Sequence, residues 1–246
     1  MENMQARETE TTLTPTQPPY PGLLPTIGFI ILYFALQGLC TGIIMAATQD
    51  VTIANPTPMP IAIIYGLVAS AIVQLFLMWL YLRRKDRMAL LGLNDFGRIP
   101  LHKATGLAIL LVVAAMAFNL AYATYAIPGI GMQEEMAKIL AGIARTPFNM
   151  AAMFFAIAIA APVVEELLFR GFLQNALTKY LPIWGAILLS SFLFALVHLQ
   201  PYAIPGLMSL SIAFGYLYHR TGSLRTNIIL HMANNIIALL ATQGLN

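Results

Sequence analysis

The sequence contains little charge and almost no cysteine. Of its 246 residues, 9% are charged and 59% are hydrophobic, whereas a soluble globular domain carries roughly 25% charge. The low charge therefore excludes an ordinary soluble domain. Cys40 is the only cysteine, so no internal disulfide can form, and a single thiol with no histidine nearby in the sequence is a poor nucleophile. We interpret Cys40 as a small packing residue.

The sequence also lacks a basic patch and a leader of the secretory type. The formal net charge is only +3, and no basic patch contains interleaved aromatic residues, so no nucleic-acid partner is expected. Residues 1–22 are rich in Thr, Pro and Glu and have no apolar stretch, which is unlike a signal peptide. We predict a disordered tail over residues 1–22, followed by a single transmembrane domain over residues 23–246.

Long apolar runs make up most of this domain. Runs of about 18 or more apolar residues are typical of helices that cross a membrane. The sequence therefore predicts an all-α fold, a polytopic transmembrane helical bundle of about seven spans in the lipid bilayer. The expected spans are Leu23–Ala47, Pro60–Leu82, Ala104–Ile127, Phe148–Phe172, Ile183–Leu199, Pro205–Tyr218 and Leu224–Thr242. The segment Met132–Arg145 predicts an amphipathic helix at the membrane surface, and an eighth short span there stays open.

The positions of Lys and Arg predict the orientation. With the N-terminus in the cytoplasm, only Lys138 and Arg145 of the 13 basic residues lie outside, as the positive-inside rule requires. We expect an integral membrane protein of a prokaryotic plasma membrane.

Two adjacent glutamates lie inside the fourth apolar run. Glu165 and Glu166 are the exceptions among 10 acidic residues, because the others lie outside the seven expected spans. A charged side chain at the bilayer centre costs about 2.5–3.5 kcal/mol on insertion scales. Such a residue marks a candidate functional site.

A histidine lies at the same predicted depth as the first glutamate. The turn between the fourth and fifth spans lies at about Lys179–Pro182, because proline is tolerated at a helix start. Glu165 and His198 each lie about 16 residues from this turn, roughly 24 Å along a helix. Two antiparallel helices joined there place the two side chains at the same height, as a Glu–His pair requires.

Two further pairs share helix faces. Glu166 and Arg170 are spaced i, i+4, so they can form a buried ion pair that leaves Glu165, about 100° away, free for chemistry. His231 and Asn235 have the same spacing on the last span. Together these residues provide a carboxylate base, a histidine and two hydrogen-bond donors, which suffice for attack of water on an amide with stabilisation of the oxyanion.

The three motifs resemble those of one known family. Glu165-Glu166-x-x-x-Arg170, Phe194-x-x-x-His198 and His231-x-x-x-Asn235, in this order on late spans, are similar to the motifs of the CAAX-protease and bacteriocin-processing intramembrane endopeptidases, which include the type II CAAX prenyl endopeptidases. The resemblance covers about residues 148–240. It implies a catalytic core there that cleaves a peptide or membrane-protein substrate, prenylated or not.

The resemblance also implies a role for each residue. Glu165 and His198 activate water, His231 and Asn235 stabilise the oxyanion, and Glu166 and Arg170 support the site. We expect no cofactor, because no His-Glu-x-x-His zinc motif is present. The alternative is zinc or another divalent metal on Glu165, His198 and His231.

Two other functions stay open. The chain can be a catalytically idle immunity or scaffold protein of the same family. It can also be an ion-coupled transporter, because Glu/His clusters inside a membrane also mark ion pathways, although no second copy of the Glu-Glu pair gives the internal repeat common in transporters.

Overall fold

The computed structural model describes residues 20–48, 58–83, 87–128, 141–143 and 145–244. The predicted N-terminal tail falls outside this part apart from its last residues, and most of the predicted amphipathic helix Met132–Arg145 also falls outside it. Helices and turns form all the described structure, which confirms the all-α class. The protein is an integral membrane protein.

The helices match the apolar runs of the sequence closely. They are α1 (Leu23–Thr48), α2 (Pro58–Leu82), the short α3 (Arg87–Leu90), α4 (Leu101–Tyr125), a long composite helix from Pro147 to Leu177, α9 (Ile183–Leu196), α10 (Ile204–Thr221) and α11 (Leu224–Gly244). The short helix α3 was not predicted from the sequence. Four of these helices, at Leu23–Thr48, Pro60–Leu82, Leu101–Tyr125 and Pro147–Leu177, are long and apolar enough to cross a membrane. A count of seven spans therefore stays a prediction.

The composite helix begins and changes pitch at identifiable residues. The Thr146 hydroxyl accepts a hydrogen bond from the Asn149 amide at 3.2 Å, and proline follows at the first helical position, a common way to start a helix. The helix consists of α6 (Pro147–Phe154), a π-helical segment η2 (Phe155–Ala160), α7 (Ala161–Glu165), a second π-helical segment η3 (Glu166–Gln174) and α8 (Asn175–Leu177). π-Helical turns are rare and occur often at functional sites.

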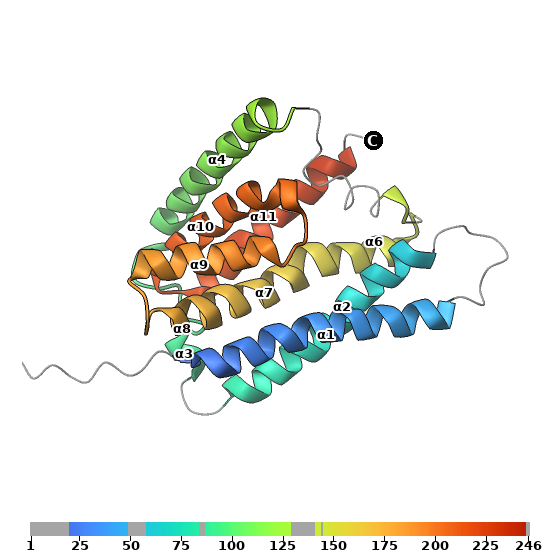
Figure 1. Cartoon of the computed structure of the whole chain (residues 1–246), viewed down its shortest axis with the longest axis horizontal. Coiled ribbons are helices and arrows are strands. Elements are labelled where there is room, and N and C mark those ends of the chain that lie inside the picture. Colours follow the sequence, from blue (N-terminus) through green and yellow to red (C-terminus); the bar gives the residue numbers. More distant parts are fainter. Residues whose placement is uncertain (1–19, 49–57, 84–86, 129–140, 144, 245–246) are drawn as a thin grey trace, which may run out of the picture.

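The composite helix forms the centre of the bundle. In Figure 1, α1 and α2 lie on one side of it, α9, α10 and α11 on the other, and α4 is outermost. The contacts agree, because α1 and α2 touch η3 and η2, α9 and α11 touch η3, and α4 packs on α10. Every residue from Glu166 to Gln174 is buried.

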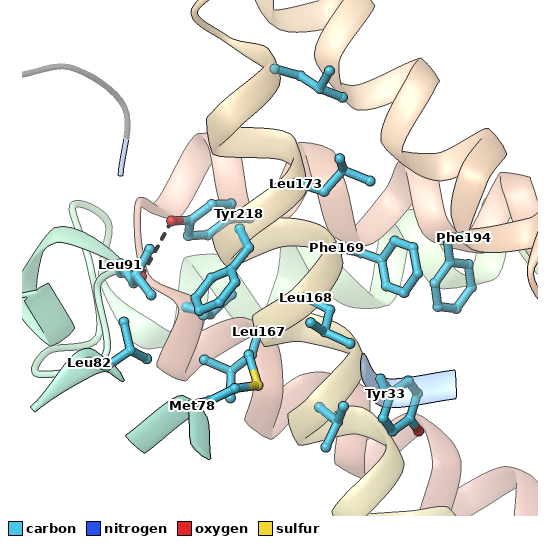
Figure 2. Packing of buried hydrophobic residues seen from close by; sticks show 14 of the residues in the cluster. Tyr33, Met78, Leu82, Leu91, Leu167, Leu168, Phe169, Leu173, Phe194 and Tyr218 are labelled. Carbon is cyan, nitrogen blue, oxygen red and sulfur yellow. Dashed lines mark hydrogen bonds between the residues drawn. The ribbon is translucent and has the colours of Figure 1, made fainter. Parts of the chain in front are cut away.

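A large apolar cluster surrounds this central segment. Figure 2 shows Leu167, Leu168 and Phe169 of η3 among side chains of α1, α2, α9 and α10, and Phe169 meets the Phe194 ring edge-on at 5.1 Å. The second glutamate and Arg170 are therefore embedded between packed helices, away from lipid.

Hydrogen bonds to the loop after α3 fix the start of α11. The backbone N–H groups of Leu224 and Arg225 donate to the carbonyls of Leu91 and Gly92 at 3.2 and 3.1 Å. The Ser223 hydroxyl donates to the carbonyls of Gly92 and Asp95. The loop after α3 thus holds the helix that carries the third motif.

Candidate active site

The carboxylate of Glu166 is the centre of a buried polar network. Its Oε1 lies 3.0 Å from Arg170 Nη1 and 2.8 Å from His231 Nδ1, and its Oε2 accepts a hydrogen bond from the Asn227 side chain at 2.6 Å. Glu166 and Asn227 are fully buried. The predicted Glu166–Arg170 pair therefore forms, and the same carboxylate also holds two residues of α11.

Arg170 joins this network to α10. Its Nη2 donates to the backbone carbonyl and the hydroxyl of Ser211 at 3.1 and 3.0 Å. The guanidinium also lies over the Phe194 ring, 4.9 Å from its centroid. A buried charge is tolerated only when it is paired and hydrogen-bonded, and these contacts meet that condition.

The hydrogen bond to Glu166 determines the tautomer of His231. An ionised carboxylate only accepts hydrogen bonds, so Nδ1 of His231 carries the proton, as inferred from this partner. The ring stacks on Phe214 with centroids 4.5 Å apart. Its other nitrogen, Nε2, lies 3.9 Å from Glu165 Oε2. His231 therefore lies between the two adjacent glutamates.

Glu165 has a different environment from its neighbour. Its side chain is 18% exposed, whereas that of Glu166 is fully buried. It lines a cavity of about 510 Å³ between the helices. The histidine nearest to it is His231 on α11, although the sequence pattern paired it with His198.

His198 lies in the turn that follows α9, because the helix ends at Leu196 and not at Leu199 as predicted. Its Nδ1 is 2.7 Å from the carbonyl oxygen of Phe194, so Nδ1 is the donor and Nε2 is free to accept. Between the described residues Glu165 and His198 there is no ion pair or hydrogen bond, but both line the same cavity.

The side chain of Asn235 uses one of its two N–H groups to bind the backbone. Its side-chain N–H donates to the carbonyl of Ile157 at 3.0 Å, and its oxygen accepts from the Asn234 amide at 3.3 Å. One N–H of Asn235 remains for another acceptor. Asn234, which belongs to none of the three motifs, also lines the cavity.

The cavity brings together the candidate residues of three motifs. Glu165, His198, His231 and Asn235 all line it, with Gln200 of the loop after α9 beside them. The remaining lining side chains are mostly apolar and come from α1, α2, the composite helix, α10 and α11. This arrangement places a carboxylate and two imidazoles in a largely apolar chamber, which is typical of a ligand-binding or active site.

Residues 147–237 match the family described as Type II CAAX prenyl endopeptidase Rce1-like. We call this part of the chain the Rce1-like domain, after the family that it matches. It begins with α6 and ends within α11, so it contains all three motifs. At the family level, the Rce1-like domain is that of a CAAX-protease-like intramembrane endopeptidase, with a peptide or protein substrate in a membrane. No curated protein and no solved structure matches the chain.

The Rce1-like domain does not hold a ready metal site in the part of the chain that the structure describes. No group of three or more His, Cys, Asp or Glu side chains is arranged there to bind an ion. Nδ1 of His231 is taken by Glu166, and Nδ1 of His198 by a backbone carbonyl. Both bonds leave Nε2 as the nitrogen that a metal could take, so a zinc ion on Glu165, His198 and His231 would need the Glu165 carboxylate and the two Nε2 atoms about 2 Å from one centre.

Three residues around the Rce1-like site were not predicted from the sequence. Asn227 of α11 hydrogen-bonds Glu166, and Ser211 of α10 hydrogen-bonds Arg170. Tyr33 of α1 lines the cavity. Asn227 closely follows the polar Arg220–Arg225 loop, where a further polar residue is expected and does not indicate a buried site. Tyr33 lies far from the three motifs in the sequence, and no local spacing relates it to them.

Proposed function

We propose that this protein hydrolyses a peptide bond inside the membrane, with Glu165 as the general base. The observation that carries the proposal is the contrast between the two glutamates. Glu166 is neutralised by Arg170 and held by Asn227 and His231, whereas Glu165 is partly exposed to the cavity. A general base must reach the proton that it removes, and Glu165 meets this requirement.

The proposed reaction needs only water and these side chains. Glu165 takes a proton from water as the water oxygen bonds to the scissile carbonyl carbon, and the carbonyl electron pair moves to its oxygen. When the tetrahedral intermediate collapses, the C–N bond breaks and the proton passes from Glu165 to the leaving amine. The products are a carboxyl group and an amine, and Glu165 is regenerated as a carboxylate.

The two histidines complement this base in different ways. Nε2 of His198 is unprotonated in the inferred tautomer and can accept a hydrogen bond from the attacking water. His231 lies between two carboxylates, and with Nδ1 on Glu166 its Nε2 can donate only when both ring nitrogens carry a proton. In that form it donates toward Glu165 or the developing oxyanion. The remaining N–H of Asn235 is the second proposed donor.

The substrate is a peptide segment that enters the bilayer. The family description names prenylated substrates, and the apolar walls of the cavity suit either a lipid-modified or an unmodified apolar peptide. We propose that no metal takes part, because the three possible ligands do not converge and a carboxylate with a histidine suffices to activate water. The N-terminus is proposed to lie in the cytoplasm, with the site in the inner half of a prokaryotic plasma membrane.

The decisive experiment compares two adjacent substitutions on the full-length protein. The probes are a farnesylated Cys-aliphatic-aliphatic-X peptide, the same peptide without the farnesyl group, and an apolar peptide with an internal cleavage site. We expect the wild type to cleave at least one of them. Glu165→Gln is expected to lose nearly all turnover with an unchanged melting temperature, whereas Glu166→Gln should lower both.

A chelator tests the metal question on the same preparation. Activity is expected to survive phenanthroline, and loss of activity that added zinc restores would overturn the metal-free mechanism. If Glu165→Gln cleaves near the wild-type rate, the general base is another group. Peptide binding without cleavage by the wild type would instead favour an idle immunity or scaffold protein.

A further inference from the structure

Helix α1 contributes to the cavity although it lies outside the Rce1-like domain. The match covers residues 147–237, yet Tyr33, Phe34 and Gln37 of α1 line the same chamber as Glu165 and His198. Tyr33 and Gln37 are spaced i, i+4, so their side chains share a helix face. The site is therefore completed by polar side chains from the N-terminal half of the chain.

The ring of Tyr33 is held firmly. Tyr33 is 6% exposed, belongs to the central apolar cluster and meets the Phe34 ring at 5.4 Å between centroids. Figure 2 shows its hydroxyl directed away from Leu168 and Phe169 of the composite helix. A ring packed in this way presents its hydroxyl in a fixed direction, which is the condition for a preorganised donor.

Two neighbours determine what this hydroxyl can do. The side chain of Gln37 and the carboxylate of Glu165 line the same cavity as Tyr33, and the Glu165 charge acts on the Tyr33 phenol. When the Gln37 amide donates to the phenolic oxygen, the phenolic proton stays available for another acceptor. That proton is then offered in the cavity that the proposed general base also lines.

The reaction needs a donor at this place. Water activated by Glu165 attacks a carbonyl beside it, so negative charge develops near Glu165 and requires neutral or positive donors. One N–H of Asn235 is already bound to Ile157. His231 donates through Nε2 only when both of its nitrogens are protonated, because Nδ1 is committed to Glu166.

We infer that the hydroxyl of Tyr33 donates a hydrogen bond to the oxyanion formed at Glu165, as a catalytic residue supplied by α1. The inference rests on the proposed peptidase function. The phenolic proton stays on Tyr33 throughout, so no bond to it is broken. Gln37 acts as a positioning residue that holds the phenolic oxygen.

Kinetics of Tyr33→Phe test the inference, because this change removes the hydroxyl and keeps the ring. The full-length protein is assayed with whichever of the three peptides the wild type cleaves. We expect turnover to fall by about 10²-fold, the typical loss for one oxyanion donor, with KM within a few fold of wild type. The melting temperature in detergent should change little.

Two companions make the result specific. Tyr20→Phe is the matched control, because Tyr20 also has a buried hydroxyl but stacks on Tyr81 and does not line the cavity. Its turnover is expected to stay at the wild-type level. Ground-state binding is measured in the Glu165→Gln background, where adding Tyr33→Phe should leave the peptide Kd unchanged.

Each outcome has a defined meaning. An unchanged turnover of Tyr33→Phe would overturn the inference while the peptidase function stands. A raised KM and Kd with intact turnover would also overturn it and make Tyr33 a substrate contact. A wild-type protein that cleaves none of the peptides would overturn the proposed function and the inference with it.

Discussion

Glu165 and Glu166 are neighbours in the chain but face different surroundings. Glu166 is fully enclosed and bound to Arg170, His231 and Asn227, so its carboxylate is not free to exchange protons with a substrate. Glu165 points into the cavity, with one imidazole nitrogen at 3.9 Å. The roughly 100° between successive side chains on a helix is thus enough to give one carboxylate a structural task and leave the other reactive.

Asn235 is expected to act in the transition state. Asn235→Ala removes the remaining N–H that can meet the oxyanion and also the bond to the Ile157 carbonyl. Turnover should fall by about 10²–10³-fold, with KM within a few fold, because the interaction forms mainly in the transition state. Kinetics with a fluorogenic peptide in detergent measure both constants. A raised KM with intact turnover would make Asn235 a substrate contact.

Local spacing predicts some parts of the site and not others. The ion pair of Glu166 and Arg170 follows from i, i+4 geometry within one helix. The bonds from Asn227 and His231 to Glu166 join residues more than 60 positions apart, and no periodicity determines such a contact. The predicted pairing of Glu165 with His198 considered only height along two helices. It left out α11, whose His231 lies nearest to the carboxylate.

Helix boundaries were predictable because apolar runs and prolines define them. The helix that carries both glutamates continues to Leu177, beyond the predicted end of the span at Phe172. The two π-helical segments were not predicted, since no residue pattern in the sequence indicates them. Gln174, near the end of this helix, is buried, and its side chain donates a hydrogen bond to the Gly215 carbonyl at 3.0 Å.

Arg170 is expected to hold η3 against α10. Arg170→Ala removes the bonds to Ser211 and leaves the Glu166 charge buried without its cation, and breaking a buried pair typically costs about 3–5 kcal/mol. The melting temperature in detergent and the activity should therefore both fall. The matched control is Arg220→Ala, since Arg220 is exposed at the end of α10 and its loss should leave melting unchanged. Unchanged melting of Arg170→Ala with lost activity would place Arg170 in the chemistry.

Gly92 is expected to be essential for the position of α11. Its φ is +65°, and an added Cβ would collide with the backbone of Gly222 and Ser223, where nothing flexible can move aside. Strain of this kind costs about 1–3 kcal/mol. Gly92→Ala should lower both melting temperature and turnover, because its carbonyl binds Arg225 and Ser223 at the start of α11.

Gly28→Ala is the control for this substitution. Gly28 is helical and has open space where a Cβ would lie, so the melting temperature should stay the same or rise slightly. Equal behaviour of the Gly92 and Gly28 variants would show that the loop after α3 does not support the site.

At the scale of the whole molecule, the Rce1-like domain is incomplete on its own. Helices α1 and α2 supply part of the cavity wall through Tyr33, Gln37 and Ala71. The loop after α3 binds the start of α11, and α4 packs along α10. The residues before 147 lie outside the family match. Their helices nevertheless cover faces of the Rce1-like domain that would be exposed without them.

A fragment of residues 146–246 is therefore expected to be inactive. Without α1 and α2 the cavity loses one wall, and without Leu91 and Gly92 the backbone donors at the start of α11 lose their acceptors. A buried N–H without a partner costs about 1–3 kcal/mol, so the fragment should melt at a lower temperature or without a cooperative transition. Co-expression with residues 1–145 should restore cleavage of the peptide that the full chain cleaves, since the contacts between the two parts are made by side chains and backbone groups on separate helices. Wild-type turnover by the fragment alone would show that the N-terminal half is dispensable, and failure of the co-expressed parts to associate would show that the covalent connection is needed for assembly.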